Sequence, residues 1–228
     1  MIGLYSANSQ AITSAPFSFG NALQFDRVND FINRTSFADE LNGTCTFGFW
    51  VKRLGICNSY LTNTSESGSY FGLRGNTNGY RFRWRNSAAE LNFTYTPTFA
   101  TGTWYSLIVS KTTTNLKIFI NGSEEVNQAY TMTNFSTGQE LRLTSSFGSG
   151  GFVIDQLFIV PNIQITSTEA TALYNGGEGA YVSETIGTPS LLINFNQNSP
   201  DSTATDASGN GNDFTLNNFD TSTCWVAH

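Results

Sequence analysis

Apolar and polar residues alternate along much of the chain with the two-residue period of a β-strand. In "TCTFGFWVKR" (residues 44–53), Cys45, Phe47 and Phe49 share one face, while Thr44, Thr46 and Gly48 lie on the other. "GYRFRWRN" (residues 79–86) alternates in the same way. Because side chains of a strand point to opposite faces in turn, these segments are predicted to be strands with one face on a core.

Two denser apolar runs predict strands that are buried on both faces. They are "TWYSLIVSK" (residues 103–111) and "GFVIDQLFIV" (residues 151–160), the second of which stops at Pro161. Continuous apolar runs of this length are typical of strands covered on both sides. After "LKIFI", the pair Asn121-Gly122 predicts a type I′ hairpin turn, since both turn positions require a positive φ.

One short helix is predicted within "ITSTEATALYNGG" (residues 165–177). Thr166 and Glu169 have the spacing of a capping box, and Gly176 can end the helix. Many short strands and a single helix predict an all-β fold, an antiparallel β-sandwich or jelly roll.

Composition agrees with this fold and excludes some functions. Aromatic residues make up 14% of the 228 residues and include 19 Phe, which is enough for a large core, whereas charged residues make up only 12%. The net charge of −6 argues against nucleic-acid binding. There is no apolar run long enough for membrane insertion, and the first residues lack the pattern of a secretory signal peptide. Three cysteines without a C-x-x-C pair favour free thiols.

Four segments stand in the order found in one known family. They are "NALQFDRVNDFIN", "CTFGFWVKR", "GTWYSLIVSKTTTNLKIFINGSEEV" and "GFVIDQLFIVPNIQITSTEATALYNGG", and together they cover about residues 18–177. In this order they resemble the laminin-G-like, concanavalin-A-like jelly roll. The resemblance implies a jelly roll over residues 1–178, and it implies that Trp104 is a buried core residue.

The C-terminal part contains a strand and a loop of a kind that the family usually carries at the start of its domain. "LLINF" followed by "DASGNGNDFTLNN" (residues 206–218) resembles the usual first strand and loop of the family, here placed after the helix. Residues 179–190 are therefore expected to be a linker, and residues 191–228 an extension that supplies a strand to its own or a neighbouring jelly roll. An unpaired strand edge is normally covered, which favours such pairing.

The same arrangement is similar to segments of bacteriophage tail and virion-surface proteins. This resemblance implies a non-enzymatic structural or adhesion module on a virion, as a decoration, fibre or tail component. Its expected partners are other virion proteins, surface glycans and further copies of the chain. A free carbohydrate-binding, lectin-like protein is the alternative.

A polysaccharide hydrolase of this fold is the second alternative. The laminarinase-like hydrolases carry Glu-x-Asp-x-x-Glu on one strand, which holds the two carboxylates at the separation needed for a retaining mechanism. No Glu of this chain has an Asp two positions later. An enzyme would need a carboxylate pair assembled from distant strands, so no catalytic residue is predicted.

Calcium is the candidate cofactor, with Asp155 and Asp206 as its candidate ligands. Asp206, Ser208 and Asn210 stand at EF-hand-like positions, but the position of the bidentate Glu holds Asn217. A looser calcium loop stays open, and Asp155 matches a position that ligates calcium in related jelly rolls. The competing interpretation is that Asp206 caps its own backbone in an Asx turn.

Four of the eight arginines lie within twelve residues. Alternation puts three of them on one face of a strand whose other face carries three aromatic rings. The four are Arg74, Arg81, Arg83 and Arg85. Because the rings belong in the core, the arginines are predicted to face outward. There they could bind acidic sugars, pair with carboxylates of a neighbouring subunit, or simply keep an exposed strand solvated.

Overall fold

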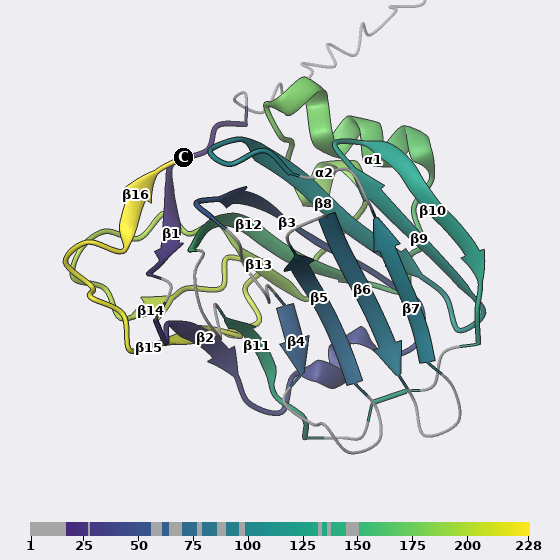
Figure 1. Ribbon diagram of the computed structural model, residues 1–228, viewed down its shortest axis with the longest axis horizontal. Helices are drawn as coiled ribbons and strands as arrows, with labels where there is room; N and C mark the ends of the chain where they lie inside the picture. Colours follow the sequence, from purple (N-terminus) through teal and green to yellow (C-terminus); the bar gives the residue numbers. More distant parts are fainter. Residues whose placement is uncertain are drawn as a thin grey trace, which may run out of the picture.

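The computed structural model shows two antiparallel β-sheets stacked face to face, with short helices against one of them (Figure 1). It describes residues 17–26, 28–55, 61–63, 70–76, 79–85, 90–95, 99–131, 134–135, 138–144 and 151–228. The all-β jelly-roll prediction is confirmed.

Sheet A contains the long strands that were predicted from apolar runs. Within the described residues its order is β10 (Ser123–Ala129), β9 (Asn115–Ile120), β8 (Trp104–Lys111), β3 (Cys45–Arg53), β12 (Phe152–Pro161), β1 (Asn21–Phe25) and β16 (Trp225–Ala227), with β13 (Leu191–Ile193) also paired to β12. The β9–β10 hairpin turns at Asn121 and Gly122, whose φ angles of 51° and 77° confirm the predicted turn.

Sheet B carries the arginine-rich strand. Its order in the described part of the chain is β14 (Thr203–Ala204), β15 (Phe214–Asn217), β2 (Phe31–Arg34), β11 (Leu141–Thr144), β4 (Leu61–Asn63), β5 (Tyr70–Asn76), β6 (Gly79–Arg85) and β7 (Glu90–Tyr95). A 3₁₀ turn, η1 (Ala38–Leu41), leads into sheet A.

The main core fills the space between the sheets. Phe25 of β1 and Phe152 of β12 are fully buried and stack with ring centroids 4.2 Å apart. Phe82 and Trp84 of β6 close the core from the side of sheet B. The predicted division of β6 into an aromatic inner face and an outer face is therefore confirmed for these two rings.

A second, smaller core lies on the outer face of sheet A, beneath α1 (Ser167–Tyr174) and α2 (Val182–Thr185). Leu173 of α1 and Val182 of α2 cover Ile108 of β8 and Phe158 of β12. These contacts explain why β8 and β12 are buried on both faces. Residues 179–190, expected to be a linker, thus contain a helix with a buried side.

The capping box of α1 is present as predicted. The Thr166 hydroxyl accepts a hydrogen bond from the Glu169 backbone N–H, and the Glu169 carboxylate accepts one from the Thr166 N–H. Asn175 and Gly176 both have a positive φ and end the helix, with η2 (Asn175–Gly177) following directly.

The C-terminal segment pairs with its own chain. β13 pairs with β12, β15 pairs with β2, and β16 pairs with β1. Figure 1 shows the yellow strand β16 beside the purple strand β1. The strand in "LLINF" is thus supplied in cis, although the predicted domain boundaries stay predictions.

Trp104 differs from its prediction as a core residue. It lies at the first position of β8 and is only half-buried, because the pairing of β8 with β9 begins three residues later, at Leu107. Cys45 and Cys224 are buried free thiols, and Cys57 lies outside the described residues.

No helix of the described part is both long and apolar enough to cross a bilayer.

The connection between β1 and β2 holds a buried carboxyl group, Asp30, which is 1% exposed. Its Oδ2 accepts a hydrogen bond from the Asp26 N–H at 2.7 Å. Burial raises the pKa of Asp30 from 3.8 to about 7. The folded protein therefore holds a proton here that the unfolded chain releases near pH 4. This group stabilises the fold below that pH, and its contribution is lost as the pH rises to about 7.

We expect Asp30→Asn to raise the melting temperature above that of the wild type at pH 8, and to lose that advantage at pH 4. The amide keeps an oxygen that can accept from the Asp26 N–H and removes the buried charge. Thermal melts at both pH values measure this, with the exposed Glu178→Gln as control. An equal difference at both pH values would contradict the assignment.

Candidate functional site

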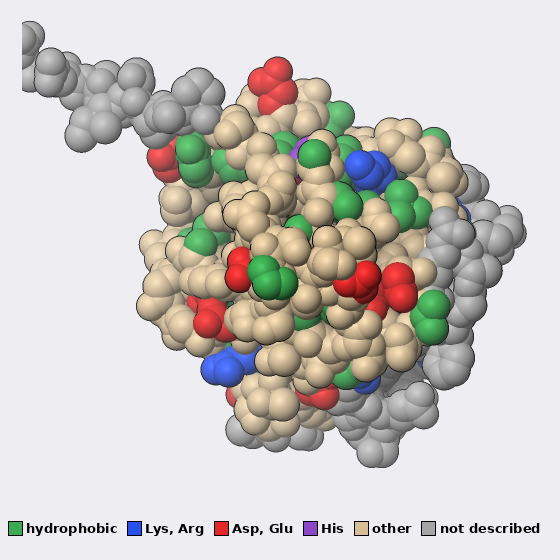
Figure 2. All heavy atoms as spheres, turned by 90° about the vertical axis from the view of Figure 1, so that its left-hand side faces the viewer, with side chains coloured by type: hydrophobic (Ala, Val, Ile, Leu, Met, Phe, Trp, Pro, Cys, Tyr) green, Lys and Arg blue, Asp and Glu red, His purple; other side chains and the backbone are tan. Residues whose placement is uncertain are grey.

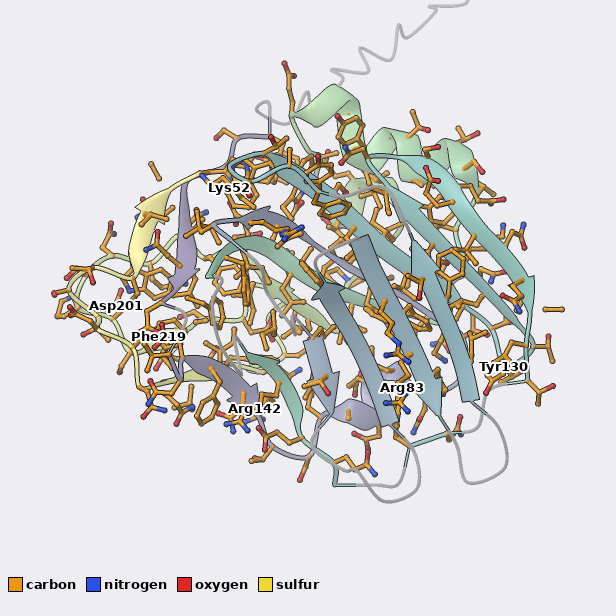
Figure 3. All side chains as sticks on the ribbon, in the orientation of Figure 1. Lys52, Arg83, Tyr130, Arg142, Asp201 and Phe219 are labelled. Carbon is orange, nitrogen blue, oxygen red and sulfur yellow. The ribbon has the colours of Figure 1, made fainter. Side chains whose placement is uncertain are left out.

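The predicted arginine surface lies on β5 and β6 of sheet B. Arg81 and Arg83 are half-buried and alternate with the buried Phe82 and Trp84, so they occupy the outer face; Arg83 can be followed on β6 in Figure 3. The strand register places Arg74 opposite Arg81. Arg85 follows Arg83 at the strand's two-residue period. The structure thus brings the positions of all four predicted arginines onto two neighbouring strands.

Asp206 organises the loop in which it lies. One carboxylate oxygen accepts hydrogen bonds from the N–H groups of Leu192 and Ser208, at 3.0 and 2.9 Å. The other accepts from the Ser208 hydroxyl and the Asn212 N–H, at 2.7 and 2.9 Å. Burial raises the pKa of Asp206, but these hydrogen bonds outweigh it and hold the pKa below its usual value. The carboxylate ties the loop to β13.

Asp155 lies at a bulge in β12 and is 1% exposed. The bulge places two residues of β12 opposite one of β3, and Gln156 within it has a φ of 45°. One Asp155 oxygen accepts from the Gln156 N–H at 2.7 Å, and the other lies 2.8 Å from Nδ1 of His228. Burial raises the pKa of Asp155, and the contact with His228 partly offsets this.

The two predicted calcium ligands, Asp155 and Asp206, already have partners within the chain. Three of the four oxygens of Asp155 and Asp206 accept hydrogen bonds from the chain, and the fourth lies 2.8 Å from Nδ1 of His228. The two carboxylates share no hydrogen-bond partner. Among the described residues, no group of three or more His, Cys, Asp or Glu side chains could hold a metal ion. Calcium binding stays a prediction, which thermal melts with added calcium and with EDTA would test.

His228 forms the centre of an aromatic stack at the edge of sheet A. Its ring lies between Phe19 and Trp104, with centroids 3.7 and 3.9 Å away and planes within 5° of parallel. Lys52 lies over the Trp104 ring at 4.7 Å. In Figure 2 the purple of the histidine shows only as a small area among green hydrophobic side chains. This stack could not be predicted from the sequence, since its rings come from separate parts of the chain.

A cavity of about 140 Å³ opens beside this stack. Its walls combine aromatic rings with short polar side chains and one buried carboxyl group. The lining residues are Phe17, Ser18, Phe19, Gly20, Asp155, Tyr181, Asn194 and Asn196. The Phe17 ring stands edge-on to Phe19 and to Tyr181, with centroids 4.9 and 5.2 Å apart. Only Asp155 of this set was singled out from the sequence.

Comparison with known families shows to which family the sandwich belongs. Residues 26–159, more than half of the chain, match the family described as the concanavalin A-like lectin/glucanases superfamily. The chain belongs to this family. The match contains β12 with Asp155, and it contains the arginine surface, but it ends before the remaining residues of the cavity from Tyr181 onward. No protein of curated function matches the chain in sequence.

Solved structures of the same fold include binding domains. Domain 4 of AbnA, an extracellular arabinanase from Geobacillus stearothermophilus in complex with arabinotriose, is similar with a TM-score of 0.56 and 17% identity, over 69% of this chain and 78% of that one. The binding domain of botulinum neurotoxin DC in complex with SialylT is similar with a TM-score of 0.55 and 12% identity, over 68% of this chain. The match spans only 42% of that toxin chain.

Proposed function

We propose that this protein is a non-enzymatic adhesion module that binds glycans, displayed on a virion surface. The observation that carries the proposal is the family match over the sandwich, because the family is built around a lectin fold. The solved arabinanase domain of this fold holds arabinotriose, and a solved toxin domain is in complex with SialylT. One is a domain in complex with a sugar and the other is a binding domain, which supports binding as the role of the fold in this chain.

The lining of the cavity, with a single carboxyl group, supports a role without catalysis at this place. A glycosidase needs two carboxyl groups about 5–9.5 Å apart on either side of the bond that is cleaved. Among the residues that line the cavity, Asp155 is the one carboxyl group, and its side chain contacts His228 and Gln156. Release of reducing sugars from polysaccharides by the purified protein would overturn this part of the proposal.

The virion setting is supported by the C-terminal segment. Its "SGNGND" loop, followed by an aromatic residue and "T-x-NN", is similar to segments of phage tail and virion-surface proteins. A hydrogen bond between the Asp206 carboxylate and the backbone of β13 holds this loop against the strand, which gives the extension a defined structure. We infer other virion proteins and further copies of the chain as partners.

Replacing Arg81, Arg83 and Arg85 by Ser is expected to weaken binding to sialylated or sulfated glycans, or to lower the oligomeric state. Guanidinium groups pair with carboxylate and sulfate, and this attraction weakens as salt screens it. The loss should therefore be larger at low salt, while the melting temperature changes little, since surface changes usually stay within about 0.5 kcal/mol each. A glycan array with and without EDTA, and light scattering after gel filtration, measure both effects.

Lys117→Ser is the matched control, since it removes a positive charge from sheet A instead. If the arginine variant binds and assembles as the wild type does, the arginines serve only to keep the strand solvated. If the wild-type protein binds no glycan and is monomeric, the proposed function itself is wrong.

A further inference from the structure

The cavity beside Asp155 has walls of the kind that hold small ligands. Binding pockets are lined mainly by apolar and aromatic groups, with a few polar groups that fix the orientation of the ligand. Here Phe17, Phe19 and Tyr181 supply the rings, and Asn194, Asn196 and Asp155 supply the polar groups. Tyr181 is 38% exposed, and among the described residues only Val28 is another exposed large hydrophobic side chain.

The polar groups of the cavity retain hydrogen-bonding capacity. The side-chain amides of Asn194 and Asn196 form no hydrogen bond with any other described residue. Each amide can donate two hydrogen bonds and accept through its oxygen. Each Asp155 oxygen has one partner from the chain and can accept a second hydrogen bond. This combination of donors and acceptors suits neighbouring hydroxyl groups, which both donate and accept.

The size of the cavity limits the ligand to one ring. An engineered cavity of roughly 150 Å³ in another protein holds one benzene molecule. The cavity here, of about 140 Å³, is of similar size. Its one carboxyl group lies next to His228, and no Arg or Lys lines it, so nothing in the wall selects an anion. A neutral ring that carries hydroxyl groups fits both the size and the charge.

We propose that this cavity binds a single neutral sugar residue of a glycan, with its hydroxyl groups on Asn194, Asn196 and Asp155 and its apolar face on the ring of Tyr181. The proposal rests on the glycan-binding function proposed above and names its site and ligand class. All lining residues except Asp155 lie outside the matched family region of residues 26–159, so the family match by itself does not define this site.

The probes are the methyl α- and β-glycosides of glucose, galactose and mannose, measured by saturation-transfer NMR and by titration. The wild type is expected to bind at least one of them with a roughly millimolar dissociation constant, as suits a ligand of one ring. Asn196→Ala removes one amide, and its affinity is expected to fall about tenfold or more. This loss corresponds to about one good hydrogen-bonded contact.

Gly20→Ala tests the same site without removing a polar group. A Cβ at Gly20 would lie 2.2 Å from the Asn196 side-chain oxygen, so Asn196 must move out of its place. The same loss of affinity is expected, with a melting temperature close to that of the wild type. Asn127→Ala, an exposed amide on β10, is the matched control and is expected to bind as the wild type does.

The outcomes separate the site from the function. Binding of a neutral glycoside that both variants lose and the control keeps would support the site. Two results would overturn the site and leave the proposed function standing. In the first, glycan binding survives both variants. In the second, the protein binds only sialylated glycans and the arginine variant loses this binding. A wild-type protein that binds neither the glycosides nor any glycan on an array would overturn both.

Discussion

Ending the chain at Gly187 is expected to abolish the folded sandwich. The deletion removes β13, β14, β15 and β16, which leaves β1 and β2 each without one neighbour. It also removes several fully or largely buried side chains, which are Leu191, Ile193, Phe195, Phe214 and Leu216. At about 1.5–3 kcal/mol for each buried side chain, the loss is roughly 10 kcal/mol, comparable with the whole stability of a typical domain.

Circular dichroism melts and gel filtration of residues 1–187 measure this loss. We expect aggregation or a chain without a cooperative transition, because the open edges of β1 and β2 would expose unpaired backbone groups. A chain ending at Ala227 is the control, since it keeps every strand and loses only the His228 stack. If residues 1–187 melt like the full chain, the extension does not complete the sandwich.

Trp84→Ala is expected to destabilise the protein far more than Trp104→Ala. Trp84 is fully buried, its ring centroid lies 4.6 Å from that of Phe135, and Lys111 lies over it at 4.9 Å. Truncating a large aromatic side chain in a core costs about 3–5 kcal/mol. For a chain of this size, this corresponds to a fall in melting temperature of roughly 6–20 °C.

Trp104 is half-buried and packs mainly on His228 and Lys52, so its truncation should lower the melting temperature by only a few degrees. Calorimetric melts of both variants at one pH provide the comparison. The reverse order of effects would mean that Trp104, rather than Trp84, is the tryptophan on which the core depends.

The features predicted correctly from the sequence are those that neighbouring residues determine. The Thr166 and Glu169 capping box, the Asn121-Gly122 turn and the buried face of β6 each depend on residues a few positions apart. In such cases the spacing of apolar residues, or a motif of a few residues, is enough to predict the structure.

The position of Trp104 and most of the candidate site could not be predicted in this way. Trp104 opens a strand that is buried along most of its length, and only the strand register shows that its first position lies before the pairing with β9 begins. The cavity joins residues near 20, 155, 181 and 195, which no local pattern connects. His228 was informative only as the single histidine of the sequence, and its partners are known from the fold alone.

The pairing of β1 has a consequence for synthesis on the ribosome. Among the described strands β1 pairs with β12 and β16, and Asn21 pairs with Ala227. At about 5–20 residues per second, the ribosome needs roughly 10–40 s to make the 200 residues between these partners. During this time β1 can pair with β12, but its other edge has no partner until β16 is made, and closing so long a loop is slow. Cotranslational folding of this sandwich should therefore be completed late, and the nascent chain should be a natural client for chaperones that cover exposed strands.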